Sequence, residues 1–400
     1  VLDRQPKRTT STVAPDATID QLLQSAGFEE TGALVVSSDG ATFEGIVSER
    51  DLFALQRVSL RRAAERIRGA QSVDALADAA GDVRGLARSL LVQGMGAEQL
   101  TQVVSALNDS LTQRVLEVVG QRHRLAGRWC WIALGSEGRL EQTLATDQDN
   151  ALIFEAGDDL EAERARYIAF AGEVNLALDA CGFPLCKGGI MARNPKWCLS
   201  LQEWRAVFLG WMRSPEPGAL LNASIFFDFR PLAGEARLAG ELRSSVLQAA
   251  SGNAAFRRAV AENALRVKPP LGLLRDFAME SAGPFAGTLD LKAYGARPIV
   301  DGARLLALAH GLPATSTAAR LRGAAAAGAL PPAEADALVE AFHFIQTLRL
   351  RHQYLESGVA AGAENRIDPE RLNAIDRRIL KAAFRQANVL QERLRLDYLL

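Results

Sequence analysis

Hydrophobic residues follow two different periods along the chain, and these periods predict its elements. Apolar residues at every third or fourth position indicate helices, whereas short alternating or continuous apolar runs indicate strands. Strands are predicted at residues 32–38, 43–47, 129–134, 150–154 and 223–232. Helices are predicted at residues 18–28, 48–55, 160–181, 199–212 and 368–394, and the sequence from 59 to 125 has a helical pattern throughout.

The order of these elements predicts four segments. A small α/β unit at residues 1–57 precedes a helical segment at 58–125. A sheet-containing segment at 126–235 precedes a second helical segment at 236–400, in which no strand is predicted. The predicted fold class is therefore α+β, a mainly helical chain with a small mixed sheet and a C-terminal helical bundle.

Two features predict the helices of the last segment. The alanine-rich stretch 320–338 predicts two short helices separated at Pro331–Pro332. Farther on, Asp368 is predicted to be the N-cap of a long helix with Pro369 at its first position. One apolar face is predicted for this helix, with Leu372, Ile375, Ile379, Ala383, Ala387, Leu390 and Leu394.

Composition narrows the class of protein. With 400 residues, 48% hydrophobic and 23% charged, the chain has the composition of a globular protein. A net charge of −1 provides no global field for nucleic acid or an anionic membrane, so neither is an expected partner. The sequence contains no apolar run of about 18 residues, so no transmembrane helix is predicted. The first residues lack the apolar core of a secretory signal. Four cysteines do not make a disulfide framework, and the cytoplasm is the predicted location.

The stretch "LGSEGRLEQTLATDQDNALIF" at residues 134–154 contains the chemistry that composition does not explain. Gly135 and Ser136 close a predicted strand and open a predicted helix over 137–143. A glycine there lets the backbone approach a ligand, and a helix N-terminus attracts phosphate. Ser136 can instead be a simple N-cap, and Arg139 can either meet phosphate or stay solvated.

Asp147 and Asp149 stand two residues apart, so on a strand both carboxylates project from one face. Two such charges repel unless a cation lies between them, which suggests a metal. The alternative is a solvated turn with acidic residues as turn formers. A third carboxylate, Asp228, interrupts an apolar strand and needs a cation, a donor or a function there. Arg230, on the same predicted strand face, is its simplest partner.

Other candidate groups are less specific. Lys187 lies beside Gly188–Gly189 and could reach a nucleotide, and Lys292 and Arg304 could close over phosphates; exposed or paired basic residues are the competing interpretation for all three. Cys181, Cys186 and Cys198 lack a fourth ligand at zinc spacing and are read as core or near-site residues. A nucleophile elbow is excluded because Leu134 occupies the position of its first glycine.

Gly-Ser followed at a distance of about eleven by Asp-x-Asp resembles the nucleotidyltransferase superfamily of DNA polymerase beta and the antibiotic-modifying transferases. "GSEGRLEQTLATDQDNAL" is more similar still to bacterial signal-transduction proteins that join cystathionine-beta-synthase (CBS) type domains to a nucleotidyltransferase domain. That group is similar to protein-PII uridylyltransferase. "FFDFRPLAG" is similar to a strand of the glutamine-synthetase adenylyltransferases. Three later segments also resemble this group: "CKGGIMARNPKWCLSLQEW", "DLKAYGARPIVDGARLLAL" and "RLRHQYL…NRIDPERL".

The resemblance implies a two-metal site for phosphoryl transfer. It places Asp147, Asp149 and Asp228 as catalytic ligands of Mg²⁺ or Mn²⁺. It places Gly135 and Ser136 at a nucleoside triphosphate, within a nucleotidyltransferase domain at 126–235. Gln148 and Asn150 are polar where the wider superfamily has an apolar residue after each aspartate, and this matches the narrower signal-transduction group. No His-Asp dipeptide occurs, so the hydrolase half of the PII-modifying enzymes is not expected.

"GALVVSSDGATFEGIVSERDLFAL" resembles one CBS unit within residues 1–57. The resemblance places Ser48 and Asp51 at the phosphate and ribose of an adenine nucleotide. The same spacing is also that of a helix capping box, which needs no ligand. Because such units act in pairs, a homodimer is expected.

The function predicted from these residues is a Mg²⁺-dependent transfer of a nucleoside monophosphate to a protein or small-molecule hydroxyl, in a signalling context. The alternative is a regulatory protein in which the same pocket binds a nucleotide but turns it over poorly.

Overall fold

The computed structural model describes residues 12–13, 33–37, 45–125, 127–272, 276–355 and 363–400, with the side chains of 12–13, 33–34 and 45–58 outside this description. Its N-terminal part is a sheet of β1 (Thr12–Val13), β2 (Ala33–Val36) and β3 (Gly45–Ser48). β2 is parallel to β1 and antiparallel to β3, which confirms the strands predicted over 32–38 and 43–47. The helix predicted at 18–28 lies outside the described residues.

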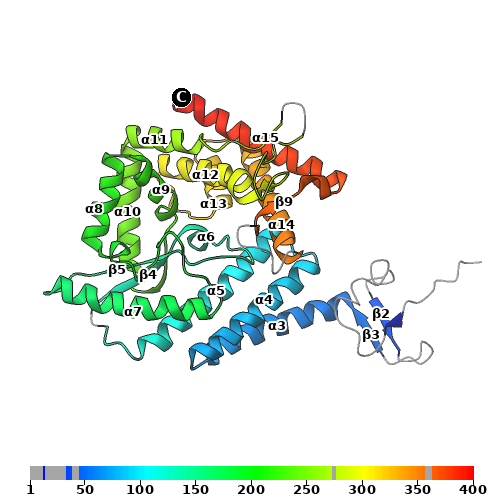
Figure 1. Cartoon of the computed structure of the whole chain (residues 1–400), viewed down its shortest axis with the longest axis horizontal. Coiled ribbons are helices and arrows are strands. Elements are labelled where there is room, and N and C mark those ends of the chain that lie inside the picture. Colours follow the sequence, from blue (N-terminus) through cyan, green and yellow to red (C-terminus); the bar gives the residue numbers. More distant parts are fainter. Residues whose placement is uncertain (1–11, 14–32, 38–44, 126, 273–275, 356–362) are drawn as a thin grey trace, which may run out of the picture.

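A mixed four-stranded sheet lies at the centre of the molecule, in the order β6-β5-β4-β7 (Figure 1). β4 (Trp129–Ala133) is antiparallel to both β5 (Asn150–Phe154) and β7 (Arg230–Gly234), and β6 (Cys198–Ser200) is parallel to β5. Alternate residues of β4 and β5 point to opposite faces. Each face is therefore covered by a different set of helices.

One face packs Trp131, Leu152 and Phe154 against helices on the N-terminal side of the chain. These helices are α3 (Glu49–Gly69), α4 (Val73–Val92), α5 (Ala97–Gly120) and α7 (Leu160–Ala180). The other face packs Ile132 and Ile153 against a second set. This set contains α8 (Leu201–Arg213), α9 (Pro217–Phe226), α10 (Ala236–Gly252) and α11 (Ala254–Ala264).

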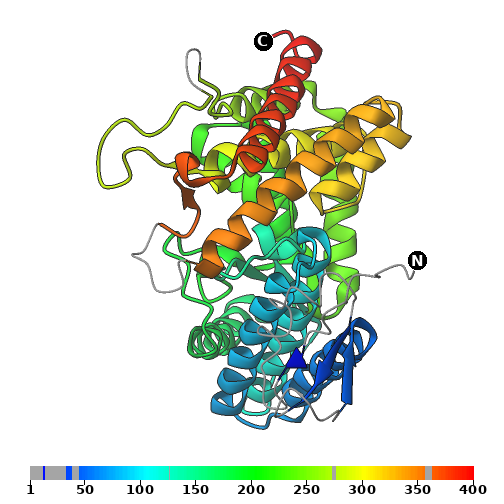
Figure 2. The same ribbon diagram turned by 90° about the vertical axis from the view of Figure 1, so that its right-hand side faces the viewer.

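The C-terminal part is a helical bundle with its own core, and it lies across the end of the central sheet where β4 and β5 are connected (Figures 1 and 2). Its helices are a π-helical segment η2 (Leu291–Ala296), α12 (Arg297–Ala309), α13 (Thr317–Ala326), α14 (Pro332–Leu355) and α15 (Ala374–Asp397). α13 and α14 confirm the break predicted at Pro331–Pro332. Two-residue strands β8 (Leu289–Asp290) and β9 (Arg366–Ile367) pair in a region where no strand was predicted.

The start of the last helix differs from the prediction. Asp368 caps only a short 3-10 turn, η3 (Pro369–Arg371), and Asn373 is the N-cap of α15, accepting from the N–H groups of Ile375 and Asp376. The buried face also differs, because Ile375 is exposed whereas Leu380 and Phe384 are buried. A better cap therefore starts the helix later, and the predicted face was wrong at its N-terminal end.

The strand predicted at 223–232 is wrong in its first half. Residues 223–226 end α9, in which Leu220, Ala223 and Phe226 are buried at helical spacing, and β7 begins only at Arg230. A short apolar run does not distinguish a buried helix from a buried strand. The consequence is that Asp228 lies in the turn between α9 and β7.

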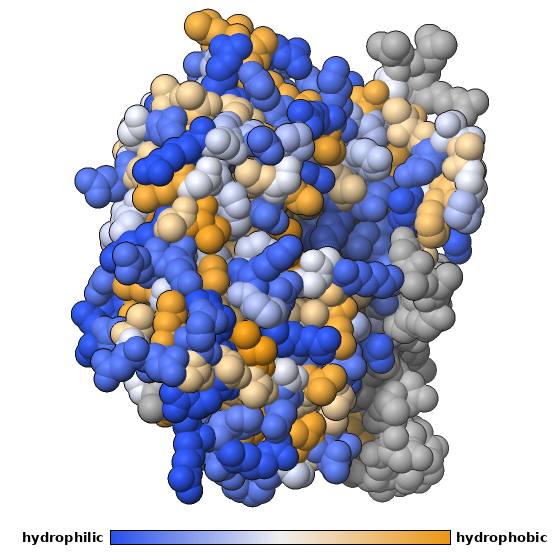
Figure 3. Space-filling view, turned by 60° about the vertical axis from the view of Figure 1, so that its left-hand side comes forward, coloured by the Kyte–Doolittle hydropathy of each residue, from blue (hydrophilic) through white to orange (hydrophobic). Residues whose placement is uncertain are grey.

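Hydrophilic residues dominate the face shown in Figure 3, and hydrophobic residues lie among them. Within the described residues, every helix is too short or too polar to span a membrane.

Candidate functional site

The connection from β4 to β5 forms the floor of the site. It begins with a single helical turn, α6 (Gly135–Gly138), and Leu140 with φ 60° then turns the chain away. The helix predicted over 137–143 is therefore confined to its first residues. Gly135 has φ 53°, and a Cβ there would lie 2.9 Å from Asp149 Oδ2. Only glycine lets the backbone adopt this conformation beside the carboxylate.

Residues 147–150 alternate between two environments just before β5. Asp147 is exposed and Asp149 half-buried, whereas Gln148 and Asn150 are buried on the opposite side. Asn175 of α7 donates from Nδ2 to Gln148 Oε1 (2.8 Å) and to Asn150 Oδ1 (3.0 Å). The polar residues that interrupt the superfamily pattern thus form a buried amide network that fixes the backbone carrying both aspartates.

A second loop supplies a third group to the two aspartates. The backbone N–H groups of Gln148 and Asn150 donate to the carbonyls of Pro184 and Ile190, which places the loop between those residues alongside. One carboxylate oxygen each from Asp147 and Asp149 and the sulfur of Cys186 all lie within 4.8 Å of one another. Burial, followed by repulsion from Asp147, raises the pKa of Asp149 to about 6. A cation at this position would remove that repulsion, so the donor set fits a divalent metal ion.

The structure corrects the role predicted for Asp228, which was expected on a strand face with the aspartate pair. It is fully buried in a turn, and both carboxylate oxygens accept hydrogen bonds from Arg304 (2.8 and 2.6 Å). Arg320 and Arg139 each add a further bond of 2.6 Å. Burial alone would raise the pKa of Asp228, but the three guanidinium groups hold it far below its usual range. Asp228 is the anion of an arginine cluster, and its predicted metal-ligand role is not supported by this geometry.

Arg230 was the simplest partner expected for Asp228, but it binds elsewhere. It donates to Asp109 Oδ1 (2.7 Å) and to the carbonyl of Glu137 (3.1 Å). Glu137 itself is a buried acid of α6 that sequence reasoning missed. Burial and then Asp109 raise its pKa to about 8, with smaller contributions from Asp149 and Asp147 and an opposing one from Arg230. Its position after Gly-Ser gave no signal, because its burial depends on how α6 packs in the folded chain, where α6 contacts β4 and the distant α9.

We expect Glu137 to make the metal-free protein less stable as pH rises. The folded state holds a proton on this group to about pH 8, whereas an ordinary glutamate releases it near 4.5. Across that window the folded protein binds more protons than the unfolded chain, so its free energy of unfolding falls. Glu137→Gln should reduce this slope to the part that Asp149 contributes, and should stabilise the protein by on the order of 2 kcal/mol at pH 8.5. The free energy of unfolding of the parent and of Glu137→Gln is measured by urea unfolding at pH 5, 7 and 8.5 with a chelator.

Glu161→Gln is the control for this experiment, because the Glu161 side chain is 79% exposed. That variant should keep the pH profile of the parent. An unaltered slope in Glu137→Gln would show that Glu137 is ionised in the folded protein.

A cavity of about 370 Å³ opens beside the aspartate pair, between the β4–β5 connection and the C-terminal bundle. This volume is typical of small-molecule sites. Four of the predicted site residues, Gly135, Ser136, Arg139 and Asp149, line it, whereas Lys187 is exposed outside it. Glu141 of the β4–β5 connection also lines it, and the bundle contributes the other charged lining residues, which are Asp290, Lys292, Arg297, Asp301, Arg304 and Arg349.

The basic residues of this cavity differ in what they already bind. Arg139 is paired with Glu141 and Asp228, and Arg304 with Asp228 and Asp301. Lys292, in contrast, makes no ion pair within the described part of the chain, and it lowers the pKa of Asp149. Arg349 donates to the side-chain oxygens of Asn365 and Gln346. An added anion could therefore bind Lys292 and Arg349 without breaking an ion pair with a carboxylate.

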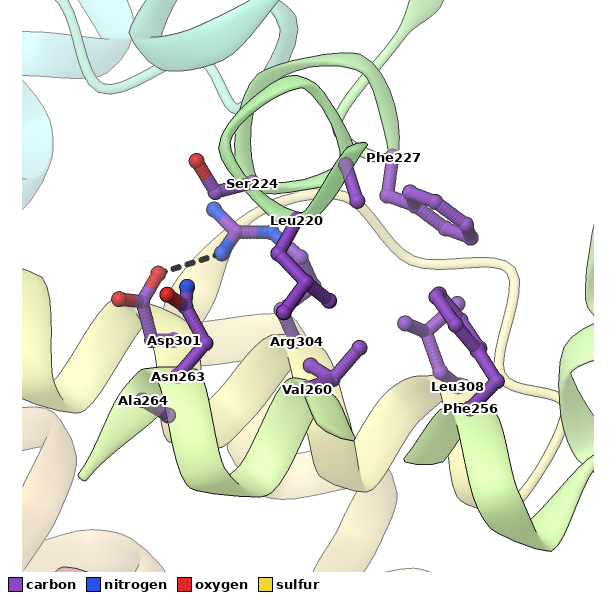
Figure 4. Close-up of a pocket in the computed structure, with 11 residues that line it drawn as sticks. Leu220, Ser224, Phe227, Phe256, Val260, Asn263, Ala264, Asp301, Arg304 and Leu308 are labelled. Carbon is purple, nitrogen blue, oxygen red and sulfur yellow. Dashed lines mark hydrogen bonds and ion pairs between the residues drawn. The ribbon is translucent and has the colours of Figure 1, made fainter. Parts of the chain in front are cut away.

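A neighbouring gap between α9, α11 and α12 is no ligand site. Figure 4 shows Leu220, Phe256 and Leu308 around it, with the Arg304–Asp301 pair at one end. Its volume is about 10 Å³, at the lower limit for one water molecule. It is a packing gap beside the arginine cluster.

Two predicted nucleotide contacts lie far from this cavity in sequence. Ser48 is the last residue of β3, and Asp51 lies in the first turn of α3, which begins at Glu49. Their backbone positions agree with the predicted helix start. Their side chains lie outside the described residues.

Two known families match the chain, and each match contains one of the two walls of the cavity. Residues 81–218 match a family described as "Putative nucleotidyltransferase DUF294", and residues 254–398 match one described as "Putative nucleotidyltransferase substrate binding domain". The first match contains the aspartate pair and the second contains Lys292 and Arg349. Asp228 lies between the two matched segments. No curated protein matches the chain.

Proposed function

We propose that this chain, a member of a nucleotidyltransferase family with a C-terminal substrate-binding domain, transfers a nucleoside monophosphate from a triphosphate to a hydroxyl group. The observation that carries the proposal is the position of the 370 Å³ cavity, which has Asp149 of the aspartate pair on one wall and the bundle on the other. The acceptor is a protein or small-molecule hydroxyl, and the setting is signalling, as the resemblance to protein-PII uridylyltransferase implies.

Different residues bind the triphosphate, neutralise its negative charge and hold the metal ion. The backbone at Gly135 and Ser136 approaches the cavity where the triphosphate would lie. Lys292 and Arg349 meet its negative charge, while Arg139 is oriented by Glu141 and Asp228. Asp147 and Asp149 would hold Mg²⁺ or Mn²⁺, which would neutralise charge on the transferred phosphate and the pyrophosphate. The amide network of Gln148, Asn150 and Asn175 keeps both carboxylates in place.

A labelling experiment tests this function. The full chain is incubated with each α-labelled nucleoside triphosphate and Mg²⁺ or Mn²⁺, and pyrophosphate release and label transfer are measured. We expect metal-dependent pyrophosphate release with one or two of the four triphosphates. The double variant Asp147→Asn, Asp149→Asn is the negative control. Equal release by the parent and this variant would contradict the proposal.

One observation favours the second function, a nucleotide sensor with little turnover. The third acid expected at the metals, Asp228, is bound by three arginines. A site with two carboxylates can bind a metal–nucleotide complex and still stabilise the transition state poorly. Saturable, metal-dependent triphosphate binding without pyrophosphate release would identify the sensor.

The N-terminal sheet is proposed to belong to a CBS-like unit that pairs with a second copy and binds an adenine nucleotide. The resemblance in sequence supports this proposal, together with the β2–β3 pairing.

A further inference from the structure

Cys186 differs from the other cysteines of the chain in its surroundings. Cys130, Cys181 and Cys198 are buried, whereas Cys186 is half-buried on the loop beside the aspartate pair. Its sulfur lies within 4.8 Å of one carboxylate oxygen each of Asp147 and Asp149. Cys186 packs against the edge of the core that covers one face of the sheet, but unlike the three buried cysteines it also places its sulfur beside two carboxylates.

The loop that carries Cys186 is fixed at both ends. The carbonyl of Pro184 accepts from Gln148 N–H (3.2 Å), and the carbonyl of Ile190 accepts from Asn150 N–H (3.2 Å). Between these bonds the chain turns, with Gly189 N–H donating to the Cys186 carbonyl (3.0 Å) and Gly189 at φ 67°. These backbone bonds hold the loop that carries Cys186 alongside residues 148–150 without any contribution from the Cys186 side chain.

We propose that Cys186 is the third protein ligand of the metal site, so that the site binds thiophilic divalent cations such as Zn²⁺ and Co²⁺ more tightly than Mg²⁺. The inference rests on the proposed function, because it uses the same two carboxylates. Carboxylate oxygens alone suit Mg²⁺ and Mn²⁺, whereas a thiolate adds a soft donor that selects Zn²⁺ and Co²⁺. Three protein ligands also leave a coordination position for a phosphate oxygen.

Cobalt provides a direct test, because a thiolate bound to Co²⁺ gives a charge-transfer band in the near ultraviolet and a carboxylate does not. The full chain is titrated with Co²⁺ in the absence of any triphosphate. We expect a sulfur-to-cobalt band that saturates at one equivalent, disappears on adding Zn²⁺ and persists in excess Mg²⁺. In Cys186→Ser the band should vanish, and Zn²⁺ affinity should fall at least about 10- to 100-fold, by comparison with the loss of outer-shell partners.

Cys181→Ala is the matched control, since Cys181 is buried at the end of α7 and does not belong to the three-residue cluster. It should keep the band and the Zn²⁺ affinity of the parent. Alkylation gives a second readout: Zn²⁺ should slow modification of Cys186 in the parent, and should slow it less in Asp149→Asn.

The outcomes separate this inference from the proposed function. Co²⁺ binding without a sulfur band, or identical Zn²⁺ affinity in Cys186→Ser, would overturn the role of Cys186 and leave nucleotidyl transfer standing. A sulfur band in a protein that releases no pyrophosphate would support Cys186 as a ligand while contradicting the transfer reaction.

Discussion

Replacing Asp149 with asparagine should lower pyrophosphate release by about 10²-fold or more, while triphosphate binding weakens far less. The substitution keeps the shape of the side chain but removes one of the two negative charges that hold a cation against the phosphate. The other cavity residues proposed to bind the triphosphate, Gly135, Ser136 and Lys292, are unchanged. Turnover and equilibrium binding are measured on the same preparation with Mg²⁺ and with Mn²⁺.

The same variant should be more stable than the parent when no metal is present. Because the pKa of Asp149 is about 6 in the folded protein against 3.8 ordinarily, its ionisation opposes folding above that range. Asparagine removes this cost, and at pH 7.5 the free energy of unfolding should rise by about 1–2 kcal/mol. Asp158→Asn, at an exposed residue of the same segment, is the control and should change neither turnover nor stability. Undiminished turnover in Asp149→Asn would remove this site from the reaction.

The sequence was sufficient for those parts of the site that depend on local chemistry. A strand, a Gly-Ser turn and a pair of aspartates before a second strand are all set by residues close in the chain. The structure has β4, Gly135–Ser136, the aspartate pair and β5 in that order. The helices were predicted for the same reason, since the spacing of apolar residues is a local property.

The rest of the site depends on contacts between distant segments. Asn175 lies in the middle of α7, and only the fold shows that it binds Gln148 and Asn150. Arg304 and Arg320 lie 76 and 92 residues beyond Asp228, and no local pattern pairs them with it. The strand position predicted for Asp228 was wrong because its apolar neighbours end α9, and two of its three arginine partners come from the distant C-terminal bundle.

The largest effect on stability is expected at Asp228. Asp228→Asn keeps the volume of the side chain but leaves Arg139, Arg304 and Arg320 close together without their shared anion. Removing one partner from a buried ionic group costs about 3–5 kcal/mol, because the remaining charges cannot be solvated. The expected loss of unfolding free energy in urea is of that size. It should be equal at pH 5 and pH 8, because the pKa of Asp228 lies far below both.

Asp276 provides the matched control for this substitution. It also binds two cations, Arg377 (3.1 Å) and Lys381 (2.6 Å), but its side chain is 39% exposed. Asp276→Asn should therefore cost less than about 1 kcal/mol, and added salt should reduce even that difference. If Asp228→Asn does not fold, the milder Arg320→Lys, which keeps the charge but loses the guanidinium geometry, should still destabilise more than Asp276→Asn. Equal costs for Asp228→Asn and Asp276→Asn would mean that the arginine cluster is solvated and that the buried ion pairs add no more stability than exposed ones.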